Sequence, residues 1–365
     1  MTAIRTALAA GFVFAAGAAH SVELRYSMFQ PPHTIEGVII GDFLEELGEK
    51  TEGRVTGKQF PGGQLLSGPA TLKGIKDGVA DMGLLVLSFT LGELKHANIV
   101  ADLQLYATDP YVAAGAANET IMADCKECTA DFTAQNSLYL GGHAATPWQL
   151  MCRQPITGLA DLAGRKVRVT GAWATRLASS LGMVSVQLPG TEIAAALSAG
   201  QIDCTVGPLL WLKDFALWDS VRSVLDVPLG ASPGLGLFVT NKDSFEAMEP
   251  KDRETLLDLA AEYAVKAMEE YPVRNKAVRD EAIGRRITFV EPDAAFTEAL
   301  EKFKQADILN VVADMEGRGV VNAQEVVDIH LKNIEEWEVL VAEIGENRTK
   351  YVETLDARTT SALRQ

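Results

Sequence analysis

Hydrophobic and polar positions alternate in two ways along the first part of the chain, and the two patterns predict strands and helices in turn. Residues 22–28 alternate with a period of two, which is typical of a strand with one buried face. A helix is predicted next, because apolar side chains recur four residues apart: Ile35, Ile39, Phe43 and Leu47. The pattern then predicts a strand at 54–60, a short helix at 71–77 and an apolar strand at 79–87. This order predicts a parallel sheet with helices on its faces.

The same order of elements returns in the second half of the chain. A short helix is predicted over 192–198, and it is followed by a glycine, two residues, an aspartate and a strand, with Gly200 and Asp203 at the fixed positions. The first half carries the same spacing at Gly78 and Asp81. This repetition predicts two similar α/β lobes. Ligands of open α/β sheets bind beyond the carboxyl ends of the strands, so we expect a ligand site in the cleft between the lobes.

The rest of the chain continues this mixed pattern. It predicts a strand at 233–241, a long helix from 249 to about 283, a strand at 285–290, a helix at 296–312 and a charged helical tail. Within the tail, Trp337 is expected to anchor packing. The expected organisation has four parts: a signal peptide at 1–21, lobe 1 at 22–146 plus 233–273, lobe 2 at 147–232 plus 274–320, and a C-terminal helical tail at 321–365.

The N-terminus has the pattern of a secretory signal peptide. Arg5 supplies a positive start, residues 7–16 a short apolar core, and the small residues near 18–21 a cleavage site. That core is too short for a membrane span, and no later segment is apolar for long enough to cross a bilayer. We therefore expect an exported protein. Its net charge of −16 disfavours nucleic acid and anionic membrane surfaces as partners.

Four cysteines fit an exported, disulfide-forming protein. Cys125 and Cys128 have the spacing of a redox or zinc motif, but they lie in a polar, helix-like run without a second pair of ligands. A structural disulfide or unreacted thiols are the favoured interpretation. Two pairs are candidates, Cys152 with Cys204 and Cys125 with Cys128, and the connectivity stays open at this point.

The chain lacks the motifs of the common hydrolases and nucleotide-binding enzymes. It has no Gly-x-Ser-x-Gly elbow, no Walker loop and no His-Glu-x-x-His, and its five histidines show no ligand spacing. Adjacent acids such as Glu45 and Glu46 fit a solvated helix face. We therefore expect a protein that is not an enzyme and uses no cofactor or metal. An exported enzyme on a two-lobe scaffold is the alternative class, because catalytic groups can converge from distant positions.

Arg168 is the most informative charged position. It lies in the short β-branched strand 166–169, bounded by Gly164 and Gly171. A charged side chain in a buried strand needs a partner, because burying an unpaired charge is costly. The partner is either an internal Asp or Glu, or a ligand carboxylate held through two parallel hydrogen bonds.

Several segments around these positions match a known family. In order, they are Phe43-Leu44-Glu45-Glu46 with Thr51 to Val55, Phe60 to Leu65, Gly78 to Met82, Pro155-Ile156 with Asp161 to Val169, and Glu192 with Ala196, Leu197, Gly200 and Asp203. Taken together, the chain resembles the extracytoplasmic solute-binding proteins of tripartite ATP-independent periplasmic (TRAP) transporters, of the DctP-like, dicarboxylate-binding type.

The resemblance implies an α/β protein of the two-lobed, Venus-flytrap kind, with a hinge of crossing strands and a long helix spanning both lobes. It implies a periplasmic location and two partners, the small and large integral membrane subunits of an ion-driven transporter. In that family the arginine at the position of Arg168 pairs with the ligand carboxylate. We expect the protein itself to be a monomer.

Other family contacts are replaced in this chain. Trp148 stands where some members have a second arginine, Gly207 where many have an asparagine, Phe29 or Gln30 where an asparagine is usual, and Val86 near the place of a glutamate. Because these polar partners are missing, a sugar acid with many hydroxyl groups is disfavoured.

Aromatic residues cluster at the positions that the resemblance assigns to ligand contacts. For each one, core packing is the simpler interpretation, but their clustering favours a cage for a cationic group. The predicted ligand is therefore a zwitterion with a carboxylate and an onium group, such as dimethylsulfoniopropionate or a betaine. An aromatic or other organic monocarboxylate is the alternative, and a dicarboxylate fits less well. The predicted ligand-binding residues are Arg168, Trp148, Trp173, Trp211, Phe29 and Gly207.

Overall fold

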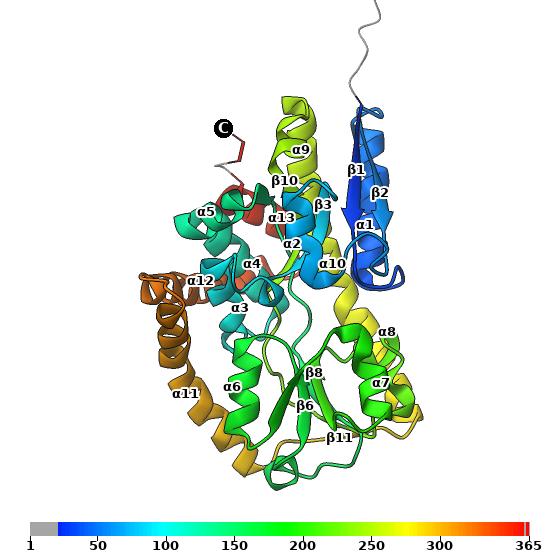
Figure 1. The fold of residues 1–365 in the computed structure, drawn as a ribbon, viewed down its shortest axis with the longest axis vertical. Helices are drawn as coiled ribbons and strands as arrows, with labels where there is room; N and C mark the ends of the chain where they lie inside the picture. The colour runs from blue at the N-terminus through cyan, green and yellow to red at the C-terminus, as the bar shows by residue number, and fades with distance from the viewer. Residues whose placement is uncertain (1–20, 361–362, 365) are drawn as a thin grey trace, which may run out of the picture.

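The computed structural model describes residues 21–360, 363 and 364, and these fold into two lobes, each built on its own sheet (Figure 1). The predicted signal peptide, 1–21, lies outside these residues apart from its last position. Lobe 1 holds a five-stranded sheet in the order β2-β1-β3-β10-β4. Its strands are β1 (Val22–Ser27), β2 (Val55–Phe60), β3 (Met82–Val86), β4 (Ser137–Tyr139) and β10 (Leu235–Asn241). Its helices are α1 (Ile35–Lys50), α2 (Thr71–Lys76), α3 (Lys95–Asp102), α4 (Pro110–Glu119), α5 (Lys126–Ala134) and α9 (Lys242–Glu246).

Lobe 2 holds a six-stranded sheet in the order β11-β9-β5-β8-β6-β7. Its strands are β5 (Gln149–Cys152), β6 (Lys166–Val169), β7 (Val184–Gln187), β8 (Cys204–Gly207), β9 (Ser223–Leu225) and β11 (Thr288–Val290). Its helices are α6 (Ala172–Ser180), α7 (Ile193–Ser198) and α8 (Trp211–Asp214). β1 pairs in parallel with β2 and β3, and β6 with β7 and β8, as the repeated order of elements predicted.

The repeated Gly-x-x-Asp spacing has the same structural role in both lobes. Gly78 and Gly200 follow their helices with φ values of +68° and +69°, a left-handed conformation that glycine adopts without steric cost. Asp81 then accepts the backbone N–H of Arg25 at 2.9 Å, and Asp203 accepts that of Lys166 at 3.0 Å. Each aspartate thus fixes the neighbouring parallel strand. Because these residues form the turn, β3 and β8 begin later than predicted.

Two chain segments cross between the lobes and run side by side. They lead from β4 to β5 and from β9 to β10, and backbone hydrogen bonds join them. Trp148 N donates to Gly230 O at 3.0 Å, and Leu229 N donates to Trp148 O at 2.9 Å. β5 and β10 enter their sheets antiparallel to their neighbours, because each follows a crossing. This pair of segments forms a hinge of crossing strands.

Helix α10 (Pro250–Gly284) contacts both lobes along its length (Figure 1). Near its start, Asp252 pairs with Arg54 of lobe 1, with 2.9 Å between Oδ1 and Nη2. Near its end, Arg279 pairs with Asp226, which follows β9 of lobe 2, at 2.5 Å. The expected long helix across the two lobes is present. Helix α11 (Ala294–Gly317) provides a second link, since Phe296 packs in the lobe 2 core and Met315 in that of lobe 1.

The C-terminal helices α12 (Ala323–Ile344) and α13 (Arg348–Thr359) pack against lobe 1. Trp337 is fully buried, and its Nε1 donates to Glu119 Oε2 at 2.7 Å. The ring lies so close to α4 that a Cβ at Gly115 would be 2.2 Å from it, so only glycine fits there. The prediction that Trp337 anchors packing is confirmed, and α12 carries a buried face beneath its charged surface.

Both candidate disulfides are formed. Cys152 and Cys204 stand opposite each other in the register of β5 and β8, so their bond joins the strand that leaves the hinge to the strand beside β6. Cys125 and Cys128 join the first turn of α5 to the residue that precedes it. Among the described residues, no helix is long and apolar enough to cross a membrane.

We predict that Trp337→Ala lowers the free energy of unfolding by about 3–5 kcal/mol, because it leaves a cavity against α4 and removes the indole donor from Glu119. Denaturant unfolding measures the effect. Val339→Ala on the same helix is the control, since Val339 is 59% exposed. A loss no larger than that of the control would show that the C-terminal helices are not integral to lobe 1.

We also predict that the purified protein, denatured without reductant, contains no free thiols, and that reduction releases four. Thiol titration with and without reductant measures both values. Two free thiols in the unreduced protein would mean that one of the bridges is absent.

Candidate functional site

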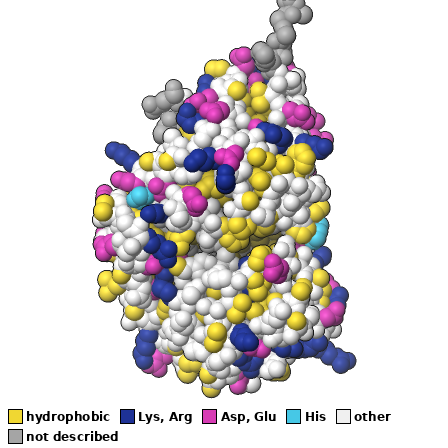
Figure 2. Space-filling model, viewed as in Figure 1, with side chains coloured by type: hydrophobic (Ala, Val, Ile, Leu, Met, Phe, Trp, Pro, Cys, Tyr) yellow, Lys and Arg dark blue, Asp and Glu magenta, His cyan; other side chains and the backbone are white. Residues whose placement is uncertain are grey.

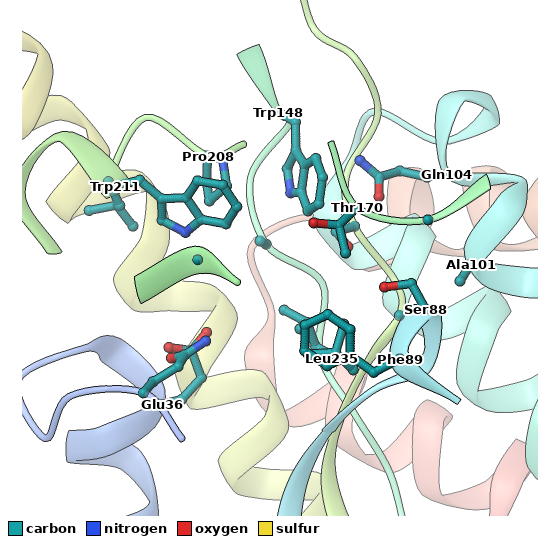
Figure 3. Close-up of a pocket in the computed structure, with 18 of the residues that line it drawn as sticks. Glu36, Ser88, Phe89, Ala101, Gln104, Trp148, Thr170, Pro208, Trp211 and Leu235 are labelled. Carbon is teal, nitrogen blue, oxygen red and sulfur yellow. The ribbon is translucent and has the colours of Figure 1, made fainter. Parts of the chain in front are cut away.

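A cavity lies between the two lobes beside the hinge, and both lobes contribute to its walls. It encloses about 990 Å³ of space outside the protein atoms, including open solvent at its mouth. Hydrophobic side chains gather on the surface around the boundary between the lobes (Figure 2). The close-up shows indole, phenyl and aliphatic groups around the space together with a few polar groups (Figure 3). Apolar walls with a few polar groups are typical of a small-molecule site.

Five of the six predicted ligand-binding residues line this cavity, although they come from separate elements. Phe29 lies in the loop between β1 and α1, Trp148 at the end of the first hinge segment, Arg168 in β6, Trp173 in the first turn of α6, and Trp211 at the start of α8. The cavity thus brings together residues that the sequence places far apart. These five residues are neighbours because the two lobes meet beside the hinge.

Gly207 does not line the cavity, and this corrects the expected site. The ring of Trp211 covers it, so that a Cβ at position 207 would lie 2.2 Å from the indole carbons. Its physical role is to let Trp211 pack against the end of β8. Trp218, close to Trp211 in sequence, stacks under the guanidinium of Arg285 at 4.8 Å from the ring centroid and also lies outside the cavity.

Arg168 is 2% exposed and makes no ion pair with any residue that the structure describes. Its Nε donates to Leu188 O at 3.0 Å, and its guanidinium lies 5.2 Å from the centroid of the Trp211 ring. Nη1 is buried without a hydrogen-bond partner. Burial lowers the pKa of Arg168 to about 10, so the group remains charged at neutral pH. The interpretation that an internal acid neutralises Arg168 is wrong.

Two further buried donors at the cavity wall have no partner. They are the indole Nε1 of Trp148 and the hydroxyl of Thr170, which follows β6, and both side chains point into the space shown in Figure 3. Buried polar groups without protein partners are rare in folded proteins, so these groups are available to a ligand in the cavity. Together with Arg168 Nη1 they offer N–H and O–H groups to acceptor atoms. A carboxylate, with two acceptor oxygens, matches this set.

The tryptophans pack against one another as well as lining the cavity. Trp148 lies between the other two, with centroid separations of 5.7 Å to Trp173 and 5.7 Å to Trp211. Trp148 and Trp173 are only 8% and 3% exposed. The same rings therefore both pack against one another and line the cavity where a ligand would contact them. The cluster presents aromatic faces and edges next to the guanidinium.

Glu36, in the first turn of α1, is a cavity residue that sequence reasoning missed. It is 4% exposed and lies across the space from Trp148 and Thr170 in Figure 3. Tyr271 OH donates to its Oε1 at 2.5 Å, and His143 Nε2 lies 3.2 Å away. Burial opposes ionisation, but the hydrogen bonds of His143 and Tyr271 outweigh it and lower the pKa of Glu36. The residue is therefore a buried carboxylate.

Asp102, at the end of α3, links the lobes at another wall of the cavity. Its Oδ1 accepts the backbone N–H of Trp173 at 2.9 Å, which places a carboxylate of lobe 1 at the N-terminus of α6 in lobe 2. Arg176 of α6 lies 3.2 Å from the other oxygen and also pairs with Asp307 of α11 at 2.6 Å. Burial raises the pKa of Asp102, although the charge of Arg176 counteracts part of the shift.

Asp214, the last residue of α8, also lines the cavity. Its carboxylate makes no hydrogen bond or ion pair with the described residues. Burial, followed by the charge of Glu36, raises the pKa of Asp214 to about 6. The sequence carried one signal for this residue, because Asp214 lies one helical turn after Trp211 and shares its face. No group of His, Cys, Asp and Glu in the described part of the chain is arranged to hold a metal ion.

Comparisons with known proteins identify the protein family. Residues 26–313 match the family described as bacterial extracellular solute-binding protein, family 7. The chain is 24% identical over 330 residues to TsaT of Comamonas testosteroni, described as an outer membrane transporter protein, and the alignment covers 89% of this chain and 95% of TsaT.

Solved structures of TRAP periplasmic solute-binding proteins share the fold. One from Rhodoferax ferrireducens, in complex with copurified benzoate, has a TM-score of 0.75 at 21% identity, covering 88% of this chain and 100% of the other. One from Bordetella bronchiseptica, with bound (R)- and (S)-mandelate, has a TM-score of 0.73 at 22% identity, covering 86% and 99%. The chain belongs to family 7 of the bacterial extracellular solute-binding proteins.

Proposed function

We propose that this protein is the periplasmic solute-binding subunit of a TRAP transporter and captures a small carboxylate in the cavity between its lobes. The observation that carries the proposal is Arg168, a charged guanidinium that is 2% exposed, lines the cavity and has no acid partner among the described residues. A ligand carboxylate would supply that partner. The family and the fold support this role.

The donors around Arg168 define how the carboxylate would be held. One oxygen accepts from Nη1 of the guanidinium, and the indole N–H of Trp148 and the hydroxyl of Thr170 are available to the ligand's other acceptor positions. Rotation about the hinge would remove water from the cleft as the lobes close. Since Coulomb attraction strengthens as the local dielectric falls, the carboxylate and Arg168 would interact more strongly in the closed state. The closed surface would then be presented to the small and large membrane subunits.

For the rest of the ligand, we propose an onium group, as in dimethylsulfoniopropionate or a betaine. The faces of Trp148, Trp173, Trp211 and Phe29 line the cavity beside Arg168. Aromatic faces attract cations, and onium groups have no hydrogen-bond donor that would need a polar acceptor. The same rings would favour the methyl groups through apolar contact.

An aromatic monocarboxylate is the second candidate. It would place its ring among the same side chains by stacking rather than through cation–π attraction. The related proteins with bound benzoate and mandelate support this candidate. A dicarboxylate fits less well, because Arg168 is the one lysine or arginine among the described residues that line the cavity.

We predict that Arg168→Ala weakens carboxylate binding by roughly 2–5 kcal/mol, because the ligand carboxylate loses a charge-assisted partner. Arg168→Lys should also bind poorly, since a point charge does not reproduce the guanidinium fork. The melting temperature without ligand should not fall, because the substitution removes an unpaired buried charge. Calorimetry and thermal melting measure the two effects.

Lys166→Ala in the same strand is the control, because Lys166 is exposed and does not line the cavity. It should leave binding unchanged. Retained affinity together with a lowered melting temperature in Arg168→Ala would instead assign Arg168 a structural role.

We predict that dimethylsulfoniopropionate binds more tightly than succinate. It should also bind more tightly than 4-methylpentanoate, which has the same shape and carboxylate but lacks the positive charge. Benzoate tests the aromatic alternative. Calorimetry on the purified protein gives the order of affinities, and product analysis after the titration tests for turnover. Equal or tighter binding of 4-methylpentanoate or succinate would exclude the cationic cage. Chemical conversion of the ligand would place the protein in the enzyme class.

A further inference from the structure

The cavity carries acids as well as its buried cation, and two of these acids come from opposite lobes. Glu36 belongs to α1 of lobe 1, and Asp214 belongs to α8 of lobe 2. The two charges interact, since Glu36 contributes to the raised pKa of Asp214. Asp102, the third acid at the wall, already pairs with Arg176 and with the backbone of α6. Glu36 and Asp214 are therefore the acids that a ligand would meet.

The two carboxylates differ in their hydrogen-bond partners within the protein. Glu36 accepts the hydroxyl of Tyr271 and lies beside His143. Asp214 has no such partner among the described residues, although it lines the same cavity. A second unpartnered acceptor, the side-chain oxygen of Gln30, is buried at the cavity wall in the loop before α1. Asp214 and Gln30 thus add acceptors to a cavity in which Arg168 offers donors.

Arg168 and Asp214 line the same cavity, and Trp211 is close to each of them. Arg168 lies 5.2 Å from the ring centroid of Trp211. Asp214 is three residues after Trp211 in the same helical segment, so the bases of the two side chains are about 5–6 Å apart. Trp211 thus lies near a cation and an anion that line one cavity. A ligand in contact with its ring would have access to both charges.

We propose that Asp214 is a specificity-determining residue, which supplies the counter-charge for a cationic group on the ligand and so selects zwitterions over anions of the same shape. This inference rests on the proposed function, in which Arg168 takes the ligand carboxylate. The chemical class is a small carboxylate whose positive centre, an onium or ammonium group, lies a few bonds from the carboxyl carbon.

The physical reason is the repulsion between the two acids across the cleft. Asp214 and Glu36 belong to different lobes, so closure holds two negative charges together in a partly desolvated space. A ligand cation between them replaces this repulsion with attraction, whereas a neutral group of equal size leaves it in place. His33, Lys213 and Arg274 also act on Asp214 and weaken its negative potential, but none of them lines the cavity. Recognition of the cation and closure of the lobes are therefore coupled.

The test compares two ligands on three proteins by calorimetry near pH 7.5. Dimethylsulfoniopropionate and 4-methylpentanoate are matched in shape and differ in charge. The proteins are the wild type, Asp214→Asn and the control Asp219→Asn, which removes the same charge from an exposed position a few residues further along the chain. Asp214→Asn should weaken dimethylsulfoniopropionate binding about tenfold or more, whereas 4-methylpentanoate binding should be unchanged or tighter, because the repulsion between the acids is removed. Asp219→Asn should change neither affinity.

Asp214→Glu provides a second variant that separates charge from packing. It keeps the carboxylate, so it should retain more of the preference for dimethylsulfoniopropionate than Asp214→Asn does. The proposal would be overturned if Asp214→Asn lost affinity for both ligands equally. It would also be overturned if this variant preferred dimethylsulfoniopropionate over 4-methylpentanoate as strongly as the wild type does. Thermal melting of each variant shows that the compared proteins are folded.

The outcomes also distinguish this inference from the function on which it rests. If carboxylates bind through Arg168 but the wild type prefers 4-methylpentanoate or benzoate, the role of Asp214 is wrong and the proposed binding function stands. If no carboxylate binds and Arg168→Ala changes nothing, the binding function itself fails.

Discussion

The guanidinium of Arg168 is the constraint on which the rest of the site depends. A buried charge without an internal acid is costly, and the protein keeps it in place with one backbone acceptor, Leu188 O, and the face of Trp211. The sheet supports this position from both sides, because β6 pairs with β7 and with β8. A carboxylate ligand in the cavity would pair with this charge.

Around this charge, the protein separates parts that hold their shape from parts that allow movement. Within each lobe, the aspartate of the Gly-x-x-Asp turn fixes neighbouring parallel strands, and the Cys152–Cys204 bridge joins β5 to β8. Between the lobes, the connections include the crossing segments, the helices α10 and α11, and the contacts of Asp102 with α6. The cavity is lined by both lobes, so its shape depends on their relative orientation, whereas the surroundings of Arg168 belong mainly to lobe 2.

The sequence predicted those parts of the fold and site that local patterns encode. Periodicity placed elements such as β1, α1 and α10 but gave no prediction for α3 and α4. The repeated spacing indicated two lobes, and Arg168 stood out as a charge in a β-branched strand. Glu36 was not predicted, because an acid in the first turn of an amphipathic helix ordinarily faces solvent, and its partners Tyr271 and His143 are distant in sequence. Asp102 was missed because its partners, Trp173 N and Arg176, come from α6 of the other lobe. Gly207 was misassigned, because nothing in its sequence context shows that the Trp211 ring folds back over it.

Helix α11 limits the kind of motion that the cleft can undergo. It is 24 residues long, about 36 Å, with its beginning held in the core of lobe 2 and its end in that of lobe 1, where α12 and α13 add further packing. Sliding of the lobes along this direction would require the helix to stretch or one of its ends to leave the core in which it packs. A rotation near the crossing strands keeps both ends packed, so we expect opening to take that form.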